Sequence, residues 1–401
     1  MGIMSGLFSP QKAAGFGPTM STSASDGWFF RAVAPETNAG VAVSEYTALQ
    51  LPVVYAAIGI VSDALAQLPL EVFQHSNGRT EKRPEHPVAR LMSYQPNEYM
   101  TPFTYRNTVQ HHAMGWGNGY SEIQRNMAGE VVGLWPLLPD RTKPYREDGR
   151  IEYRTSVDGE YFPLDPEKVL HIPAMGFDGL IGYSPIWLCR QAIGMALAME
   201  EFGGKFFKND MKSGGFIHYP GQLGDKARKN LADSTQNQGG LDKAHRVKIL
   251  EEGAKFVQTT IPPEDAQFLG SREFQIAEIA RIYRVPLHML QSHEKSTAWG
   301  SGLEQMTLGF LQYTLEPWLV RWEQEMNRKL FTEREREQGY YVKHNVAELL
   351  RGDAGARSQF YERALDPETG WMLRNEVRER EDMNPLDDNE WQRENAEEVI
   401  E

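Results

Sequence analysis

The sequence predicts an α+β fold, in which strands and helices occupy different parts of the chain. Two observations carry this prediction. Between about residues 118 and 174, short runs rich in β-branched and aromatic residues alternate with turn residues, as in a meander of antiparallel strands. On both sides of that stretch, apolar residues recur every three or four positions, which indicates amphipathic helices.

Composition bounds the class of protein. The chain has 401 residues, 40% of them hydrophobic, so it is long enough for about two to four substructures with a real core. The one cysteine, Cys189, excludes an intrachain disulfide, suits a reducing compartment and is expected to be buried. No apolar run reaches the ~18 residues that a membrane helix needs. Residues 1–27 lack the pattern of a signal peptide, are rich in Gly, Ser and Thr, and are expected to be flexible.

Charge is unevenly distributed along the chain. The net charge is −13, and residues 331–401 hold 19 acidic and 10 basic side chains, whereas residues 201–300 hold 12 and 14. An acidic chain does not fit a protein that coats DNA through a basic face. It is compatible with a protein past which nucleic acid must slide, because like charge weakens the attraction to phosphates.

Helices open the chain and strands follow. A helix is expected over residues 47–68, ended by Pro69, with one apolar stripe of Val54, Ile58, Val61 and Leu65. After a short strand at 70–74, a turn at Asn77 and Gly78 and a short helix at 86–95, Thr101 and Pro102 begin another helix as N-cap and first helical residue. Strands are then expected at residues 118–126, 130–138, 150–157, 160–164 and 169–174.

A long helix is expected to begin at Ser184 and Pro185 and to run for about 26 residues. Its small residues would allow a neighbouring backbone to approach closely; they are Ala192, Gly194, Ala196 and Ala198. A strand within 213–223, a polar helix at 224–240 and a hairpin at 244–261 that turns near residues 251–254 are expected to follow.

The most informative stretch runs from residue 280 to residue 330. A helix over 264–285 ends before Pro286, a polar loop follows at 291–300, and a long helix over 302–330 contains Pro317, which should bend it. The loop holds no catalytic set, yet it joins two amphipathic helices, which favours a mechanical or gating element. Two shorter helices are expected in the tail, at 353–364 and 374–382.

Taken together, the chain resembles the portal proteins of long-tailed bacteriophages, the head–tail connector family, across most of residues 40–350. The resemblance rests on the order and spacing of several stretches, such as "VLHIPAMGFDGLIGYSPI" and "LEPWLVRWEQEMNRKLF". The full set covers residues 55–74, 86–139, 169–186, 213–223, 247–258, 274–290 and 315–331. The tail after Leu350 matches nothing specific, and the loop 291–300 is aligned by position only.

The resemblance implies a portal fold and a ring, usually of twelve subunits, at one capsid vertex, which forms the channel for packaging and ejection of double-stranded DNA. It divides the chain into a mixed α/β wing, two stem helices that flank a small α/β clip, a tunnel loop, a kinked wing helix and a helical crown. The implied ranges are wing 28–183, first stem helix 184–213, clip 214–262, second stem helix 263–286, tunnel loop 287–301, long wing helix 302–334 and crown 335–401.

The resemblance also implies partners and a location. The clip would dock the terminase large subunit, which supplies the energy, and later the head–tail adaptor proteins. Major capsid and scaffold proteins would surround the ring in the virion, at the portal vertex, after assembly in the host cytoplasm. No membrane contact, cofactor, metal or enzymatic activity is implied.

Three groups of residues are candidates for contacts, each with a plainer alternative. Spaced lysines could touch phosphates in the channel, or could simply be a solvated helix face: Lys205, Lys208 and Lys212. Clip basics could meet the motor or adaptor, or be ordinary surface: Lys226, Arg228, Lys229, Lys243 and Arg246. The tunnel loop could point at DNA, or be an ordinary mobile loop: Gln291, Ser292, His293, Glu294, Lys295, Ser296 and Thr297.

Other classes of protein are weighed against this one. Another non-catalytic neck or scaffold protein would also lack catalytic motifs. A subunit of a DNA-processing enzyme would require a nucleotide or metal site. The sequence has no nucleophile elbow, no HExxH motif and no Walker A lysine. The pair His111 and His112 is expected to pack rather than to bind metal, and the glycine-rich "GWGNGY" is expected to be a turn between helix and strand.

Overall fold

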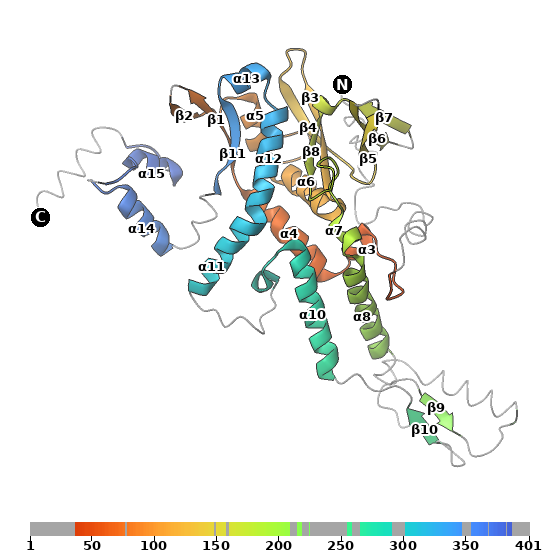
Figure 1. Ribbon diagram of the computed structural model, residues 1–401. Coiled ribbons are helices and arrows are strands. Elements are labelled where there is room, and N and C mark those ends of the chain that lie inside the picture. The colour runs from red at the N-terminus through yellow and green to blue at the C-terminus, as the bar shows by residue number, and fades with distance from the viewer. Residues whose placement is uncertain are drawn as a thin grey trace, which may run out of the picture. The chain divides into compact units, whose positions relative to one another are not determined.

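The structure is a computed structural model that describes residues 37–76, 78–147, 150–157, 160–208, 215–218, 224, 255–258, 265–290, 301–346, 354–367, 369–381 and 383–386 (Figure 1). The chain divides into two compact units, residues 1–343 and 344–401. Each unit is described by itself.

The first unit combines helices with short strands. Its α-helices are α3 (Glu45–Ala48), α4 (Pro52–Gln67), α5 (Pro87–Ser93), α6 (Pro102–Trp116), α7 (Pro185–Leu188), α8 (Arg190–Lys208), α10 (Asp265–Tyr283), α11 (Ser301–Phe310), α12 (Glu316–Lys329) and α13 (Glu333–Glu337). The unit also contains two 3₁₀ turns, η2 (Pro166–Lys168) and η4 (Leu287–Leu290), and a π-helical turn, η5 (Leu311–Leu315). The strands are β1 (Leu70–Ser76), β2 (Arg79–Lys82), β3 (Asn118–Arg125), β4 (Val131–Leu137), β5 (Thr142–Glu147), β6 (Arg150–Val157), β7 (Glu160–Leu164), β8 (Val169–Pro173), β9 (Gly215–His218), β10 (Lys255–Gln258) and β11 (Tyr340–His344).

Helix α4 contains the predicted apolar stripe, and α6 packs against it. The four stripe residues are all buried: Val54, Ile58, Val61 and Leu65. The helix starts at Pro52 rather than at residue 47, because Leu51 takes the extended conformation that a following proline favours. The predicted N-cap of α6 is confirmed, since the Thr101 hydroxyl accepts a hydrogen bond from the Thr104 amide.

The strands form small sheets with the orders β4-β3-β8, β5-β6-β7, β11-β1-β2 and β10-β9. The five strands expected between residues 118 and 174 are all present as β3, β4, β6, β7 and β8. Sequence reasoning missed β2, β5 and β11, which are short strands on the edges of their sheets. Strand β10 pairs with β9, whereas the prediction paired it with residues just before the turn at 251–254.

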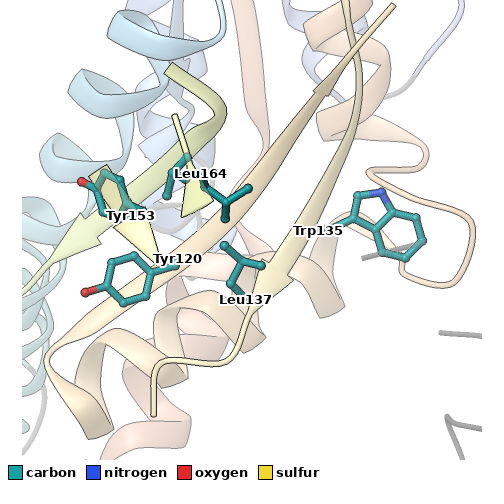
Figure 2. Packing of buried hydrophobic residues seen from close by; sticks show 6 residues of the cluster. Tyr120, Trp135, Leu137, Tyr153 and Leu164 are labelled. Atoms are coloured by element: carbon teal, nitrogen blue, oxygen red, sulfur yellow. The ribbon is translucent and has the colours of Figure 1, made fainter. Parts of the chain in front are cut away.

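A cluster of buried side chains joins two of the sheets (Figure 2). Tyr120 on β3 lies opposite Leu137 on β4, and Tyr153 on β6 lies opposite Leu164 on β7. The rings of Tyr120 and Tyr153 meet edge to face, with 6.0 Å between their centroids. Because cross-strand pairs from two sheets share one apolar contact, the strands of this part of the chain form one core.

Two predictions about the long helices need correction. The helix expected from residue 184 begins at Ser184 as predicted but is broken at Cys189, whose backbone leaves the helical region between α7 and α8. Cys189 itself is only half-buried, not buried as expected, because this break sets it beside a cavity rather than in the core.

The boundary of the C-terminal region also differs from the prediction. Strand β11 is hydrogen-bonded to β1, so residues 340–343 belong to the first unit, and the division falls at His344 instead of residue 335. The second unit contains the two predicted tail helices, α14 (Ala354–Ala364) and α15 (Arg374–Arg380). The Tyr361 hydroxyl lies 2.6 Å from Glu381 Oε1 and ties the end of α15 to α14.

Candidate functional site at the junction of the paired helices

Helices α8 and α10 lie side by side, and α10 also contacts α4 (Figure 1). Ile193 on α8 and Ile279 on α10 are fully buried in this contact region. The small residues of α8 do allow a close approach, but the neighbour is the segment at residues 37 and 38. A Cβ on Gly194 would lie 2.5 Å from Thr37 Oγ1, and the Asn38 amide donates to Gln191 Oε1 at 2.9 Å.

Two basic side chains of the pair, one on each helix, form ion pairs within their own helix. Lys205, the one predicted channel lysine whose side chain is described, is 69% exposed and forms an ion pair of 2.6 Å with Glu201. The hydrogen bond and positive charge of Lys205 lower the pKa of Glu201. Arg281 pairs with Glu278 on α10 in the same way. This part of α8 and α10 therefore offers phosphates few cations without a partner.

The turn after α10 is held by its own backbone. Arg284 adopts a left-handed conformation, with φ of 56°, and the Val285 amide donates to the Ala280 carbonyl at 3.0 Å. This is the six-to-one bond that closes a Schellman cap, although glycine is the usual residue in such a position. Buried Val285 then anchors the chain before Pro286 and η4.

A second turn, η5, is hydrogen-bonded to the first one. The Thr314 hydroxyl donates to the Arg284 carbonyl at 2.7 Å. The π-helical turn stands directly before Pro317, which lies in the first turn of α12. A proline has no amide to donate and its ring crowds the carbonyl four residues earlier, so the wider turn accommodates it. The axis changes direction between α11 and α12, as Pro317 predicted (Figure 1).

The hydrogen bond from Thr314 to the Arg284 carbonyl joins the two turns, which lie on either side of residues 291–300 in the sequence. That segment includes all the predicted tunnel-loop residues, 291–297, and lies outside the described residues. The side chains of Lys208 and Lys212 also lie outside them, as do the five predicted clip residues between 226 and 246. Of the predicted contact residues, the structure therefore describes the side chain of Lys205 alone. It also describes the turns before and after the predicted loop.

A cavity of about 220 Å³ opens at the same junction. Its walls come from the end of α6, residues 174–189, the end of α10, η5 and the first turns of α12. Arg284 and Arg321 both line it. The Arg321 guanidinium lies over the Trp318 ring at 4.9 Å and donates to the Pro317 carbonyl at 3.2 Å. Burial, and then the charge of Arg284, lowers the pKa of Arg321.

One wall of the cavity is fixed by Asn118, in the glycine-rich segment. Its side-chain amide donates to the Gly182 carbonyl and its Oδ1 accepts from the Gly182 amide, both at 2.8 Å. A Cβ on Gly117, where φ is 81°, would overlap the Tyr183 carbonyl. The segment is thus the predicted turn between helix and strand, and it also clamps residues 174–183, a role that sequence reasoning missed.

His171 completes this clamp as a neutral ring. Its Nε2 lies 3.0 Å from Asn118 Oδ1, which can only accept, so Nε2 carries the hydrogen. Its Nδ1, 3.1 Å from the Tyr153 hydroxyl, is then the acceptor. Burial, and to a smaller extent the charge of Arg328, lowers the pKa of His171 to about 3.

The described residues contain few clusters of side chains that could bind a metal or react. No group of His, Cys, Asp or Glu in the described ranges could hold a metal ion. His112 is buried, which lowers its pKa to about 3, and it packs against Trp116 at 6.0 Å, as expected for a packing role. Among the described residues, no helix is long and apolar enough to cross a membrane.

Known proteins show strong similarity to the chain. The model of the phage portal protein family matches residues 52–382. The portal protein of Enterobacteria phage HK97 is 35% identical over 86% of this chain and 81% of its own length. The probable portal protein of Streptomyces phage phiC31 is 34% identical over 87% and 78%.

Solved structures show the same fold at lower identity. An HK97-family phage portal protein from Corynebacterium diphtheriae has a TM-score of 0.58 at 14% identity and covers 78% of this chain and 98% of its own. A chain from the neck of a native gene transfer agent particle computed with C12 symmetry has a TM-score of 0.57 at 20% identity, over 90% and 100%. A chain from the neck of an empty particle computed with C6 symmetry has a TM-score of 0.60 at 21% identity, over 85% and 94%.

Proposed function

The chain belongs to the phage portal protein family, and on that premise we propose that copies of it form a ring at one capsid vertex, through which double-stranded DNA is packaged and ejected. The observation that carries the proposal is identity of 35% and 34% to two phage portal proteins over most of this chain and most of theirs. Twelve copies are expected, in line with the C12 symmetry used for a similar chain.

The ranges of the sequence division remain part of the proposal, with one change. The wing would span residues 28–183, the stem helices 184–213 and 263–286, the clip 214–262, the tunnel loop 287–301 and the long wing helix 302–334. The crown would begin at His344, because β11 pairs with β1 and joins the residues before it to the wing. Helices α8 and α10 would then be the described parts of the stem.

The proposed channel acts passively. DNA has to slide along it, and strong phosphate contacts would hold the DNA in place. The pairing of Lys205 with Glu201 and of Arg281 with Glu278 supports weak contact, because each cation already has a carboxylate beside it. We expect the chain to catalyse no reaction itself.

The motor and the other partners are separate proteins in this proposal. The terminase large subunit would dock on the clip during packaging, through basic residues between 226 and 246, and head–tail adaptors would replace it. Major capsid and scaffold proteins would contact the outside of the ring. The protein would lie at the portal vertex of the virion, after assembly in the host cytoplasm.

Electron microscopy of the purified chain tests the ring directly. Negative-stain images should show closed rings with a central hole. Monomers under all conditions of concentration and salt would contradict the proposal. An assay for ATP hydrolysis, with and without DNA, checks the enzymatic alternative, because turnover by the isolated chain would place it with DNA-processing enzymes instead.

A substitution in the predicted tunnel loop tests the channel separately from the ring. Lys295→Ala removes a positive charge from residues expected to face DNA, so packaging yield or DNA retention should change while ring assembly stays normal. Lys205→Ala is the matched control on α8, where the lysine is already paired. An unchanged packaging yield for Lys295→Ala would remove that residue from the mechanism.

A further inference from the structure

The side chains that line the cavity at the end of α10 carry positive charge and no negative charge. Two guanidinium groups line it, Arg284 and Arg321, and none of its lining residues is acidic. Within the described part of the chain, neither arginine forms an ion pair. Arg321 is half-buried and stands close enough to Arg284 for their charges to oppose each other. A carboxylate between them would relieve that repulsion and gain charge-assisted hydrogen bonds.

The rest of the lining favours a protein ligand over a free inorganic anion. Most of the walls are apolar or aromatic, and Met175, Tyr183 and Leu188 at the cavity are 68%, 41% and 47% exposed. Phe177 and Trp187, in the same segment, are 90% and 53% exposed. Arginine, tyrosine and tryptophan surrounded by apolar side chains are the residues that typically anchor protein interfaces.

The walls are already fixed in the single chain. Asn118 clamps the segment 174–183 through Gly182, and Thr314 holds the Arg284 carbonyl. The exposed apolar residues are therefore carried by a rigid support. A preformed site of this kind loses little conformational entropy when it is filled, which favours a permanent contact.

We propose that this cavity receives a carboxylate side chain of an adjacent copy of the chain, seated between Arg284 and Arg321. The inference rests on the proposed ring, in which every copy offers the same cavity to its neighbour through a head-to-tail contact. An adjacent copy can supply the carboxylate, because each chain carries 55 acidic side chains against 42 basic ones. The partner carboxylate belongs to a different surface of the same molecule.

The single cysteine gives a direct readout without any substitution. Cys189 lines the cavity and is half-buried, and burial raises the pKa of its thiol. Monomer and ring fractions of the wild-type chain are treated with a maleimide, and the rate of Cys189 labelling is followed by mass spectrometry. A neighbour seated in the cavity should slow labelling in rings by about tenfold or more relative to monomers, because it covers the thiol. Equal rates in the two fractions would overturn the proposal.

Charge-removing variants test the two arginines. Arg284→Gln combined with Arg321→Gln should raise the concentration needed for half-assembly about tenfold or more, since two charge-assisted contacts are lost. Arg328→Gln is the matched control, because Arg328 lies on α12, is paired with Glu325 and does not line the cavity. Circular dichroism establishes that each variant is folded. Assembly of the double variant at wild-type concentration would refute the inference.

Two further outcomes separate this proposal from others. If inorganic phosphate protects Cys189 in monomers and the double variant still assembles normally, the cavity binds a free anion and the proposal is wrong. If the wild-type chain forms no rings at all, the proposed function fails, and this inference fails with it. Rings that form normally with an accessible Cys189 would refute the inference while leaving the proposed function intact.

Discussion

In the sheet that contains β3, the side chains of Tyr120 and Leu137 are almost completely buried within one chain, whereas on α8 and α10 the apolar side chains of Met195, Phe202 and Phe274 are about half exposed. The strand region also satisfies its polar groups internally, as in the contacts of His171 with Asn118 and Tyr153. On the paired helices, part of the apolar surface stays exposed. The difference is in line with a strand region that is stable by itself and with helices that would gain further contacts in the proposed ring.

The largest expected effect is on the buried core that the strand region shares with α12, which packs against β8. Trp322→Ala removes a fully buried ring whose Nε1 donates to Gln110 Oε1 at 2.9 Å. Loss of the ring leaves a cavity and an amide without its donor, so the free energy of unfolding should fall by about 3–5 kcal/mol. Urea denaturation measures it, and Trp187→Ala, at an exposed tryptophan, should cost less than about 1 kcal/mol. Equal losses for both variants would break the comparison.

The clamp on residues 174–183 comes next. Asn118→Ala removes two hydrogen bonds to Gly182 and one to His171, all buried, and should destabilise the protein by about 2–3 kcal/mol. Hydrogen exchange of residues 174–183 should quicken as the segment loses its support. Asn107→Ala, whose amide contacts Asp63 at the surface, serves as the control. Unchanged exchange in Asn118→Ala would show that the glycine contacts alone hold the segment.

A gradual effect, smaller within any one pH unit than the two above, should appear when the pH is lowered. Burial depresses the pKa of His171 to about 3 in the folded chain, so the unfolded chain binds a proton that the folded chain does not. The stability is complete above the unfolded pKa of about 6.5 and is lost progressively below it, at up to about 1.4 kcal/mol per pH unit. His112 should contribute in the same direction.

Replacing the imidazole of His171 tests whether this residue causes the pH dependence. His171→Gln should flatten the dependence of the unfolding free energy on pH between about 6.5 and 4. A wild-type slope in His171→Gln would assign the effect to other groups.

The smallest effect on stability is expected where the helices are exposed. Phe274→Ser on α10 removes a ring that is 57% exposed and contacts the Arg281 guanidinium at 5.9 Å. The free energy of unfolding of this variant should differ from that of the wild-type chain by less than about 1 kcal/mol. Assembly of the subunits into the portal ring, measured by mass photometry, should weaken. A large loss of stability with normal assembly would mean that this surface serves the single chain and not the ring.

Sequence reasoning located most elements and few contacts. The caps at Thr101 and Ser184, the stripe on α4 and the bend at Pro317 follow from local chemistry, and the structure confirms each of them. The break at Cys189 escaped because "PIWLCRQAIGMA" carries no proline or glycine at that position. Strand β11 escaped because its partner β1 lies far away in the sequence, as the bond from Gln74 to the Gln338 carbonyl illustrates.

The sequence by itself determined the family, through the order and spacing of several stretches. It also determined the α+β class and the starts of α6 and α7, because caps, prolines and apolar periodicity act over a few residues and can be read locally. Only the tertiary structure decided which residues share a site. Arg284, Thr314 and Arg321 meet at one cavity, and Asn118 reaches Gly182, because the packing of α10, η5 and α12 closes those distances. Such contacts depend on the geometry of packed elements, which no local pattern encodes.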